Sequence, residues 1–228
     1  MKTVLRVTMF FLTVISLASC DWDDDGYSLG DFWVDFGLIE SGDDGENFTI
    51  HVDDGYAIVP VNMNQIDTEK WANDTRVIVN YTIVGDKDVE AEEKVYYAKI
   101  NDLDKVLYKP VFEITPETED SIGNDPIIVD NMWVKDHMLS FRLHYYGNSK
   151  IHFINLVKSP GEVTEDDLPL QLELRHNEKG DQRSYLMTAF VTFDLRSIQV
   201  EGLNSMAIEI RGTGYDEVDY MYDIDYTY

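Results

Sequence analysis

The alternation of apolar and polar side chains is the clearest pattern in the second half of the chain. It places an apolar residue at every second position of four stretches: 139–145, 170–175, 185–195 and 218–228. A period of two is typical of a β-strand with one face on a core and the other in water. Several such strands predict an antiparallel β-sandwich over residues 127–228.

The last of these stretches is rich in tyrosine. Its apolar stripe contains Ile224 and four tyrosines: Tyr220, Tyr222, Tyr226 and Tyr228. Exposed tyrosines can bind sugar rings, but membership of an apolar stripe favours packing in a core or between domains.

The first half also predicts strands, interrupted by one short helix. The strand-like runs are rich in Val, Ile and aromatic residues: 32–40, 47–53, 56–61, 76–84 and 95–107. Asp53-Asp54-Gly55 supplies turn chemistry between two runs, because Gly tolerates positive φ and Asp bonds to nearby backbone. A helical stretch, 66–73, follows the third run. Three strands, a helix and two strands are the order of an OB-type barrel, which we predict over residues 32–109.

Prolines mark the joint between the two strand-rich regions. Three of the six prolines lie there, namely Pro110, Pro116 and Pro126. Proline lacks a backbone donor, so residues 110–126 are predicted to form a linker. Within this segment, Asp120-Ser121-Ile122 resembles the short O-glycosylation motif of exported Bacteroidetes proteins, which makes Ser121 a candidate glycosylation site.

The N-terminus has the layout of a lipoprotein signal. Two bases in residues 1–19 precede an apolar stretch that is shorter than the ~20 residues needed to span a bilayer. Leu17-Ala18-Ser19-Cys20 resembles the lipobox of bacterial lipoproteins, and Cys20 is the only cysteine. We expect cleavage before Cys20, acylation of its thiol and attachment to a lipid bilayer. The alternative is an ordinary cleaved signal followed by a free thiol.

The charge balance is strongly acidic. The 18 Lys+Arg against 44 Asp+Glu give −26, and removal of the two bases in the signal deepens this to −28. Four of the acids lie in a tether, residues 20–31, directly after the cysteine: Asp21, Asp23, Asp24 and Asp25. This run resembles the surface-export signal of Bacteroidetes lipoproteins, so we expect an outer-membrane location facing the cell exterior. Such acidity excludes nucleic acid as a partner, whereas it suits a basic peptide or an envelope protein.

Catalytic motifs are absent from the sequence. It contains no nucleophile elbow, no H-E-x-x-H, no P-loop and no G-x-G-x-x-G. With 44 acids, carboxylate pairs arise by chance, and no glycosidase can be assigned from them. We therefore expect a protein that is not an enzyme and has no cofactor.

Two histidines form a candidate metal pair. If the chain turned back as a hairpin through Gly147-Asn148-Ser149, His144 would lie opposite His152. Two imidazoles across a strand pair could hold a transition metal, with His176 or an acid as third ligand. A structural pair that hydrogen-bonds the backbone is the favoured interpretation.

Short motifs in a fixed order carry a family resemblance. After the lipobox and the acidic run come Asp31-Phe32-Trp33, Trp133 to Leu139, and segments 152–157, 172–181 and 191–195. Together they resemble the NigD-like lipoprotein family of Bacteroidetes. The resemblance implies an OB-type domain followed by a β-sandwich across the mature chain, and it supplies no catalytic residues. The family takes its name from a bacteriocin-associated operon, which implies a role in immunity or export.

The sequence thus predicts an all-β, lipid-anchored surface protein that acts as a protein- or peptide-binding module. A surface glycan-binding accessory protein is the alternative function.

Overall fold

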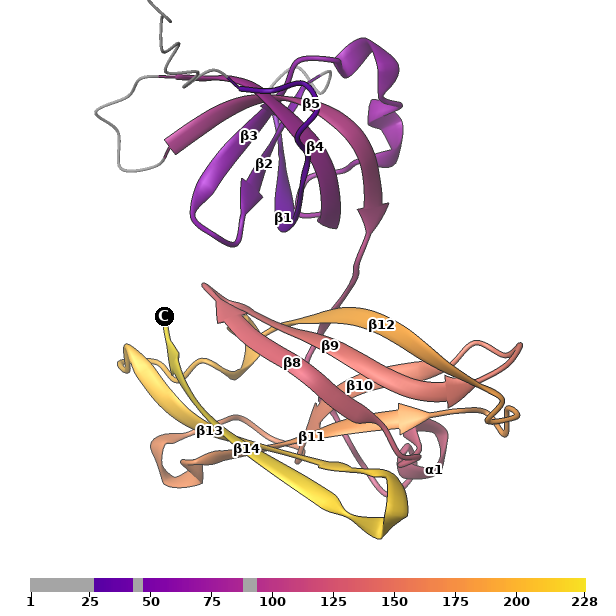
Figure 1. Ribbon diagram of the computed structural model, residues 1–228. Helices are drawn as coiled ribbons and strands as arrows, with labels where there is room; N and C mark the ends of the chain where they lie inside the picture. Colours follow the sequence, from indigo (N-terminus) through magenta and orange to yellow (C-terminus); the bar gives the residue numbers. More distant parts are fainter. Residues whose placement is uncertain (1–26, 43–46, 88–93) are drawn as a thin grey trace, which may run out of the picture.

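Two β-structured units make up the computed structural model, which describes residues 27–42, 47–87 and 94–228. An N-terminal barrel lies above a C-terminal sandwich (Figure 1). None of the helices in these described ranges is long and apolar enough to cross a membrane.

The N-terminal unit is a closed five-stranded barrel with the strand order β1-β2-β3-β5-β4. Its strands are β1 (Trp33–Ser41), β2 (Phe48–Val52), β3 (Tyr56–Pro60), β4 (Arg76–Lys87) and β5 (Lys94–Lys105). The β3–β5 pair is parallel, while the β1–β4 pair that closes the barrel is antiparallel. Gly55 occupies the turn between β2 and β3 with φ of +87°, which accounts for the Asp-Asp-Gly sequence there. The predicted OB-type barrel is confirmed.

The helix expected over 66–73 is instead a pair of 3₁₀ turns, η1 (Met63–Gln65) and η2 (Thr68–Lys70). Neither turn contains a buried residue. Most of the stability of a short helix comes from a packed face, so this segment gains little from continuing as an α-helix. Ile66 and Trp71 still pack against the barrel core.

The C-terminal unit is a sandwich of two sheets, ordered β14-β13-β11-β10-β7 and β6-β12-β9-β8. The strands that form its body are β8 (Ile128–Lys135), β9 (Met138–Gly147), β10 (Phe153–Lys158), β11 (Leu170–Asn177), β12 (Tyr185–Asp194), β13 (Ser205–Thr213) and β14 (Asp219–Thr227). Short turns η3 (Glu165–Asp167), η4 (Arg196–Ile198) and η5 (Tyr215–Glu217) connect them. The predicted sandwich is confirmed, but its sheets are mixed, because β11 and β13 pair in parallel.

The end of the predicted barrel domain and the start of the predicted linker contribute to both sheets of the sandwich. β6 (Leu107–Pro110) pairs in parallel with β12, and β7 (Phe112–Glu113) pairs in parallel with β10. A short helix, α1 (Glu119–Ile122), follows. Edge positions tolerate proline because one side of the strand needs no donor, so Pro110 does not prevent pairing there.

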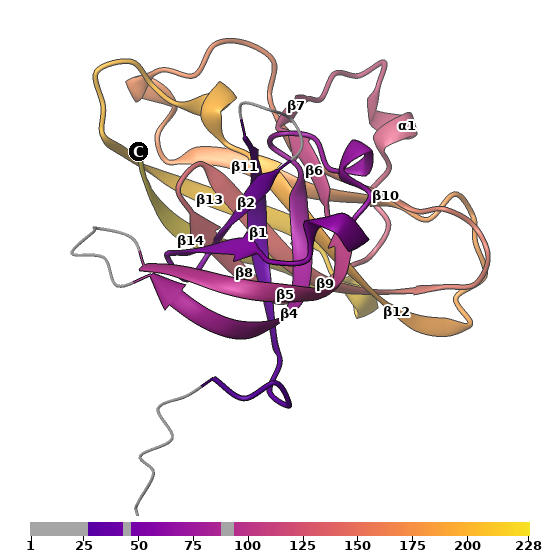
Figure 2. The same cartoon turned by 90° about the horizontal axis from the view of Figure 1, so that it is seen from above.

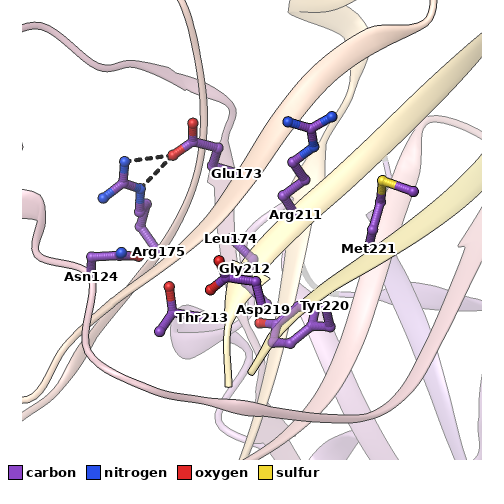
Figure 3. Close-up of a pocket in the computed structure, with 10 residues that line it drawn as sticks. All are labelled: Asn124, Glu173, Leu174, Arg175, Arg211, Gly212, Thr213, Asp219, Tyr220 and Met221. Carbon is purple, nitrogen blue, oxygen red and sulfur yellow. Dashed lines mark hydrogen bonds and ion pairs between the residues drawn. The ribbon is translucent and has the colours of Figure 1, made fainter. Parts of the chain in front are cut away.

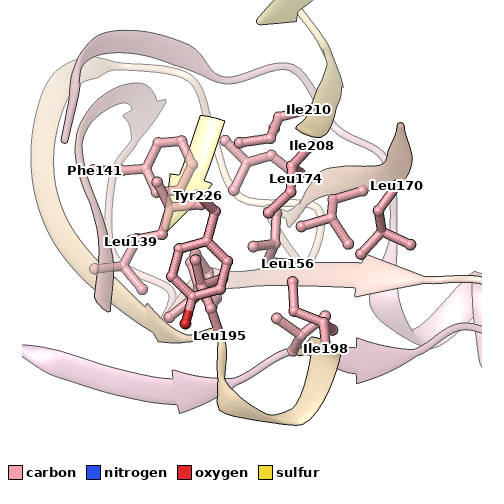
Figure 4. Packing of buried hydrophobic residues seen from close by; sticks show 14 of the residues in the cluster. Leu139, Phe141, Leu156, Leu170, Leu174, Leu195, Ile198, Ile208, Ile210 and Tyr226 are labelled. Atoms are coloured by element: carbon pink, nitrogen blue, oxygen red, sulfur yellow. The ribbon is translucent and has the colours of Figure 1, made fainter. Parts of the chain in front are cut away.

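Most of the alternating residues of the sandwich strands form its core, but Tyr185, Met187 and Val218 of the predicted apolar stripes are exposed. Phe141, Leu174, Ile208 and Tyr226 are among the fully buried side chains that pack between the sheets (Figure 4). Three of the four stripe tyrosines pack as predicted, since Tyr220 and Tyr228 also contact this core, whereas Tyr222 is half-buried outside it. The outer face of the β9–β12 sheet is only partly exposed to solvent, because the barrel lies over part of it (Figure 2).

Candidate functional site at the barrel–sandwich junction

A buried ion pair joins the two domains. The Arg76 side chain has no solvent exposure, while that of Asp53 is 13% exposed. Its guanidinium binds both oxygens of the Asp53 carboxylate, with 2.6 Å between Nη1 and Oδ1. It also donates to two sandwich hydroxyls, over 3.3 Å to Thr192 Oγ1 and 3.2 Å to Ser140 Oγ. Because a buried charge is tolerated only when paired and hydrogen-bonded, this contact fixes the two domains against each other.

Aromatic side chains surround the ion pair. Trp133 on β8 donates its indole N–H to Asp53 Oδ2 over 2.7 Å. Phe36 on β1 packs against Trp133 and Phe190, with ring centroids 5.0 and 5.2 Å apart. The Arg76 guanidinium carbon lies 5.6 Å from the Phe36 centroid, within cation–π distance. The junction is therefore packed like a protein interior, and the surfaces beside it are preformed.

A groove of about 340 Å³ opens beside this contact, with one wall from each domain. Its lining consists of Val34, Asp35, Phe36, Val52, Asp53, Asp54, Asn131, Trp133, Arg142 and Phe190. The Arg142 guanidinium is paired with the Asp130 carboxylate, so its charge is matched on the sandwich side. Asp54 on the barrel side is exposed. The groove thus combines aromatic surface with an acidic wall.

One buried phenol, Tyr81, and one half-buried phenol, Tyr56, hold Asp35 at this wall. The Tyr81 and Tyr56 hydroxyls donate to Asp35 Oδ2 over 2.9 and 3.1 Å. Burial raises the pKa of Tyr56 to about 12, and burial also raises the pKa of Tyr81. Both phenols therefore keep their protons at neutral pH and orient the carboxylate.

The lining suits noncovalent recognition. None of the described residues that line the groove is Ser, Cys, His or Lys, so it presents no ordinary nucleophile or general base besides carboxylates. Asp35 and Asp53 are engaged in hydrogen bonds, whereas Asp54 is available to a cation. Aromatic faces beside carboxylates can hold a side chain that is both apolar and positively charged.

Another pocket, on β11, β13 and β14, is explained by packing (Figure 3). Its two arginines are matched within the sheet, because Arg175 bonds Glu173 and Arg211 bonds Glu209. The Tyr220 ring lies against Gly212, where a Cβ would collide with the phenol. Its remaining charged residue, Asp219, is exposed at the start of β14.

The predicted register of His144 against His152 is wrong. β9, which contains His144, pairs with β8 and β12, whereas β10, which begins directly after His152, pairs with β11 and β7 in the other sheet. The chain crosses between the sheets after Gly147, because the Asp181 carboxylate accepts the backbone N–H groups of Asn148, Ser149 and Lys150 and holds the crossing loop. His144 lies on the barrel-facing side of its sheet and bonds Thr188 Oγ1 over 3.0 Å.

His152 instead belongs to a buried cluster with His176 and Asp181. The His176 Nδ1 lies 2.9 Å from the Pro126 carbonyl oxygen, its Nε2 lies 2.9 Å from His152 Nδ1, and His152 Nε2 lies 3.2 Å from Asp181 Oδ2. Both ends of this series are acceptors, and each of its hydrogen bonds needs one proton. The two imidazoles must therefore share three N–H protons and carry one positive charge.

The pKa shifts within the cluster agree with a single positive charge on the two imidazoles. Burial of Asp181 would raise its pKa, but the backbone N–H groups of Asn148 and Lys150 and the His152 ring hold the pKa below its usual range. Burial lowers the pKa of His176, and the neighbouring His152 lowers it further. Asp181 therefore stays ionised, and burial disfavours the charged form of His176.

The other predicted site residues lie away from the groove or outside the described part of the chain. Ser121 lies exposed on α1, where its hydroxyl donates to the Thr118 carbonyl over 2.8 Å. The lipidation and export residues, Cys20, Asp21, Asp23, Asp24 and Asp25, lie outside the described residues. Within the described ranges, no group of three or more His, Cys, Asp or Glu side chains could hold a metal ion.

Comparison with known protein families gives two matches that divide the chain at the joint between its domains. Residues 36–106 match the NigD-like N-terminal OB domain, and residues 110–226 match the NigD-like C-terminal β-sandwich domain. The chain belongs to the NigD-like family. The resemblance drawn from short motifs is thereby confirmed, and none of the curated proteins matches this NigD-like chain.

Solved structures share this fold at low sequence identity. A protein from Parabacteroides distasonis named as toxin-related has a TM-score of 0.71 at 24% identity, over 86% of this chain and 94% of its own. A NigD-like immunity protein from Bacteroides caccae has a TM-score of 0.63 at 18% identity, over 86% and 96%. A Bacteroides fragilis protein named as a lipoprotein has a TM-score of 0.61 at 12% identity, over 86% and 99%.

Sequence reasoning missed the residues that build the junction. Asp53 was interpreted only as part of a turn, and Arg76 only as the start of a strand. Ser140 and Thr192 were expected to face water, but they are 2% and 0% exposed, because the barrel covers them. The available signal was Arg76 itself, a charged residue at the head of the apolar run Val77-Ile78-Val79.

Proposed function

We propose that this NigD-like protein is a lipid-anchored, surface-exposed binding protein of the outer membrane that holds a basic peptide or protein segment in the junction groove. The observation that carries the proposal is the pairing of an acidic barrel wall, Asp35 and Asp54, with the aromatic side chains of Phe36, Trp133 and Phe190. Sites at domain interfaces that combine apolar surface with a few convergent polar groups are typical of ligand binding.

Charge supports a cationic ligand. The formal charge of −26 attracts basic peptides over a distance and raises their association rate. Once docked, a lysine or arginine stem can lie on Trp133 while its charged head meets Asp54. The role is noncovalent in this proposal, since the groove offers no nucleophile.

The biological setting is proposed to be immunity or export of a secreted antimicrobial peptide or toxin. The family resemblance supports this setting, and one structural neighbour is itself called an immunity protein. Capture of a basic peptide at the cell surface, before it reaches its target, is the simplest way in which a noncatalytic groove could protect a cell.

Peptide binding tests the groove directly. Isothermal titration with a lysine- and leucine-rich peptide, and with its glutamate counterpart of equal length, should reveal binding of the cationic peptide alone. Asp54→Asn should weaken that binding about fivefold, because a rim charge contributes modestly. Asp104→Asn, which removes another exposed carboxylate from β5, is the matched control and should leave the affinity unchanged.

The opposite pattern would overturn the proposal. If Asp54→Asn and Asp104→Asn weakened binding equally, net charge rather than the groove would hold the peptide. Preference for neutral oligosaccharides over both peptides would establish the glycan-binding alternative instead.

Cell fractionation tests the anchor. Cys20→Ala should move the protein from the membrane fraction to the soluble fraction, and unchanged membrane association would refute acylation. Replacement of Asp21, Asp23, Asp24 and Asp25 by Asn should keep the anchor but reduce digestion by protease added to whole cells. Unaltered digestion would show that the acidic tether is not an export signal.

A further inference from the structure

One end of the sandwich displays exposed apolar side chains. The loop after β9 and the loop before β12 project there (Figure 1), and we call residues 147–153 and 178–185 the sandwich tip. Ile151 is 80% exposed, Tyr185 is 64% exposed and Phe153 is 45% exposed. A cluster of exposed aliphatic and aromatic residues on one end of a folded domain marks an interaction surface.

The tip is also the site of a surplus of positive charge. Its two acids are matched internally, because Glu178 lies 2.8 Å from the Arg183 guanidinium and Asp181 contacts the protonated histidine pair. Within the described part of the chain, neither Lys150 nor Lys179 has an acidic partner. The Lys179 ammonium lies 4.9 Å from the Phe153 ring centroid, and the Lys150 ammonium donates to the carbonyls of Lys179 and Gly180. This local excess contrasts with the −26 of the whole chain.

The buried histidine cluster orders both loops of the tip. Asp181 belongs to the second loop, yet its carboxylate accepts backbone N–H groups from Asn148, Ser149 and Lys150 of the first. The side chains of His152 and Asp181 are only 2% and 3% exposed. A charged and fully hydrogen-bonded network beneath two surface loops holds their exposed residues in a fixed arrangement.

We propose that the sandwich tip docks on an anionic lipid surface, as a membrane contact separate from the acyl anchor. Apolar side chains flanked by lysines match the interface of a bilayer, where the chains enter the headgroup region and the ammonium groups meet phosphates. The acidic remainder of the protein is repelled by the same headgroups, so the tip is the end that approaches them. This contact is independent of the proposed peptide groove, which lies between the β8–β9–β12 sheet and the barrel.

Vesicle binding tests the proposal. The protein would be the chain from Asp21 to Tyr228, which lacks only the signal and the acylated cysteine and keeps every described residue of both domains. Co-sedimentation would use vesicles of phosphatidylcholine alone and of equal parts phosphatidylcholine and phosphatidylglycerol. Binding to the mixed vesicles alone, weakened by added salt, is expected. Absence of binding, or equal binding to both vesicles, would overturn the proposal.

Variants locate the contact. Lys150→Gln and Lys179→Gln should each lower the partition coefficient about fivefold, the effect of one basic residue at a charged membrane. Ile151→Asp should lower it about tenfold or more, because a buried aliphatic contact is replaced by a like charge. The matched controls are Leu29→Asp, at a residue that is also 80% exposed, and Lys99→Gln on the barrel. If the controls reduced binding as much as the tip variants, the tip would not be the docking surface.

Discussion

This NigD-like protein has two buried charged clusters: one connects the two domains, and the other connects two loops within the sandwich. The cluster of Arg76 and Asp53 joins the barrel to a sandwich residue, Thr192, that is 116 positions away in sequence. The cluster of His152, His176 and Asp181 joins two loops of a single domain, at most 29 positions apart. The first therefore determines how the domains sit together, whereas the second determines the shape of one end of the sandwich.

The clusters also differ in the chemistry of their cations. A guanidinium keeps its charge at every pH at which the protein is folded, so the junction holds the groove in one geometry. Burial lowers the pKa of the His176 imidazole, so the support of the sandwich tip gains a further charge only when the pH falls. Of these two buried clusters, only the one built on histidines therefore contains a side chain whose charge changes on acidification.

Loss of the Arg76 guanidinium at the junction should reduce the stability of the protein more than any other change considered. Arg76→Met should lower the free energy of unfolding by about 3–5 kcal/mol, because Asp53 is left with an unmatched and largely buried charge. Arg211→Met is the control, since its side chain is 59% exposed in a pair with Glu209 and should cost about 1 kcal/mol or less. Urea denaturation measures both, and equal losses would contradict the structural role of Arg76.

Removal of one hydrogen-bond donor at the junction, the indole N–H of Trp133, should lower the stability of the protein by a smaller amount. Trp133→Phe retains an aromatic ring against Phe36 but deletes the indole N–H that bonds Asp53, so we expect a loss of about 2 kcal/mol. Trp71→Phe, at a half-buried tryptophan of the barrel, should cost less. The same denaturation series would contradict the importance of this bond if the two variants were indistinguishable.

Acidification should act on the histidine cluster and leave the junction intact. The pKa of His176 is lowered in the folded state, so its contribution to stability is present above the unfolded value of about 6.5 and is lost as the pH falls. Each proton bound only by the unfolded chain makes stability fall by up to about 1.4 kcal/mol per pH unit.

Urea denaturation between about pH 7.5 and about pH 5 would measure this dependence. His176→Gln should flatten it, and His144→Gln should not, because His144 lies in the other sheet. An unchanged slope in His176→Gln would show that other groups cause the loss of stability.

The smallest expected effect is local. Asp181→Asn removes the charged acceptor beneath the tip, so the amides of Asn148, Ser149 and Lys150 should exchange with deuterium on the order of tenfold faster. Asp167→Asn removes a carboxylate that bonds only Thr164 in the described structure and should leave these amides unaltered. Protection equal to that of the wild type would mean that Asp181 does not order the loop.

Most of the strands could be predicted from sequence, and so could both domain types. The period-two stretch predicted at 185–195 is β12, Tyr185–Asp194, and the stretch predicted at 76–84 lies within β4, Arg76–Lys87. Alternation is a local property, because each side chain of a strand points to the face opposite its neighbour's. The same reasoning failed at 66–73, where polar residues suited a helix but no buried face stabilised one.

Pairing between strands was harder to predict than the strands themselves. The hairpin expected through Gly147 does not form, because the loop bonds to Asp181, which lies more than thirty positions further along the chain. Likewise, residues 107–113 were assigned to a barrel and a linker, yet they complete the edges of both sandwich sheets. Strand partners depend on distant segments, so local pattern does not specify them.

The all-β class, the order of barrel and sandwich, the family and the acidic charge all follow from the sequence. Periodicity, motif order and composition do not depend on which distant segments come into contact. The tertiary structure alone decided that Asp53 and Arg76 meet Ser140 and Thr192, and that His152 meets His176 rather than His144. These contacts join residues that are remote in sequence, and their free energy depends on burial and geometry that exist only after the domains pack. The groove and the tip, which carry the proposed functions, both arise at such contacts.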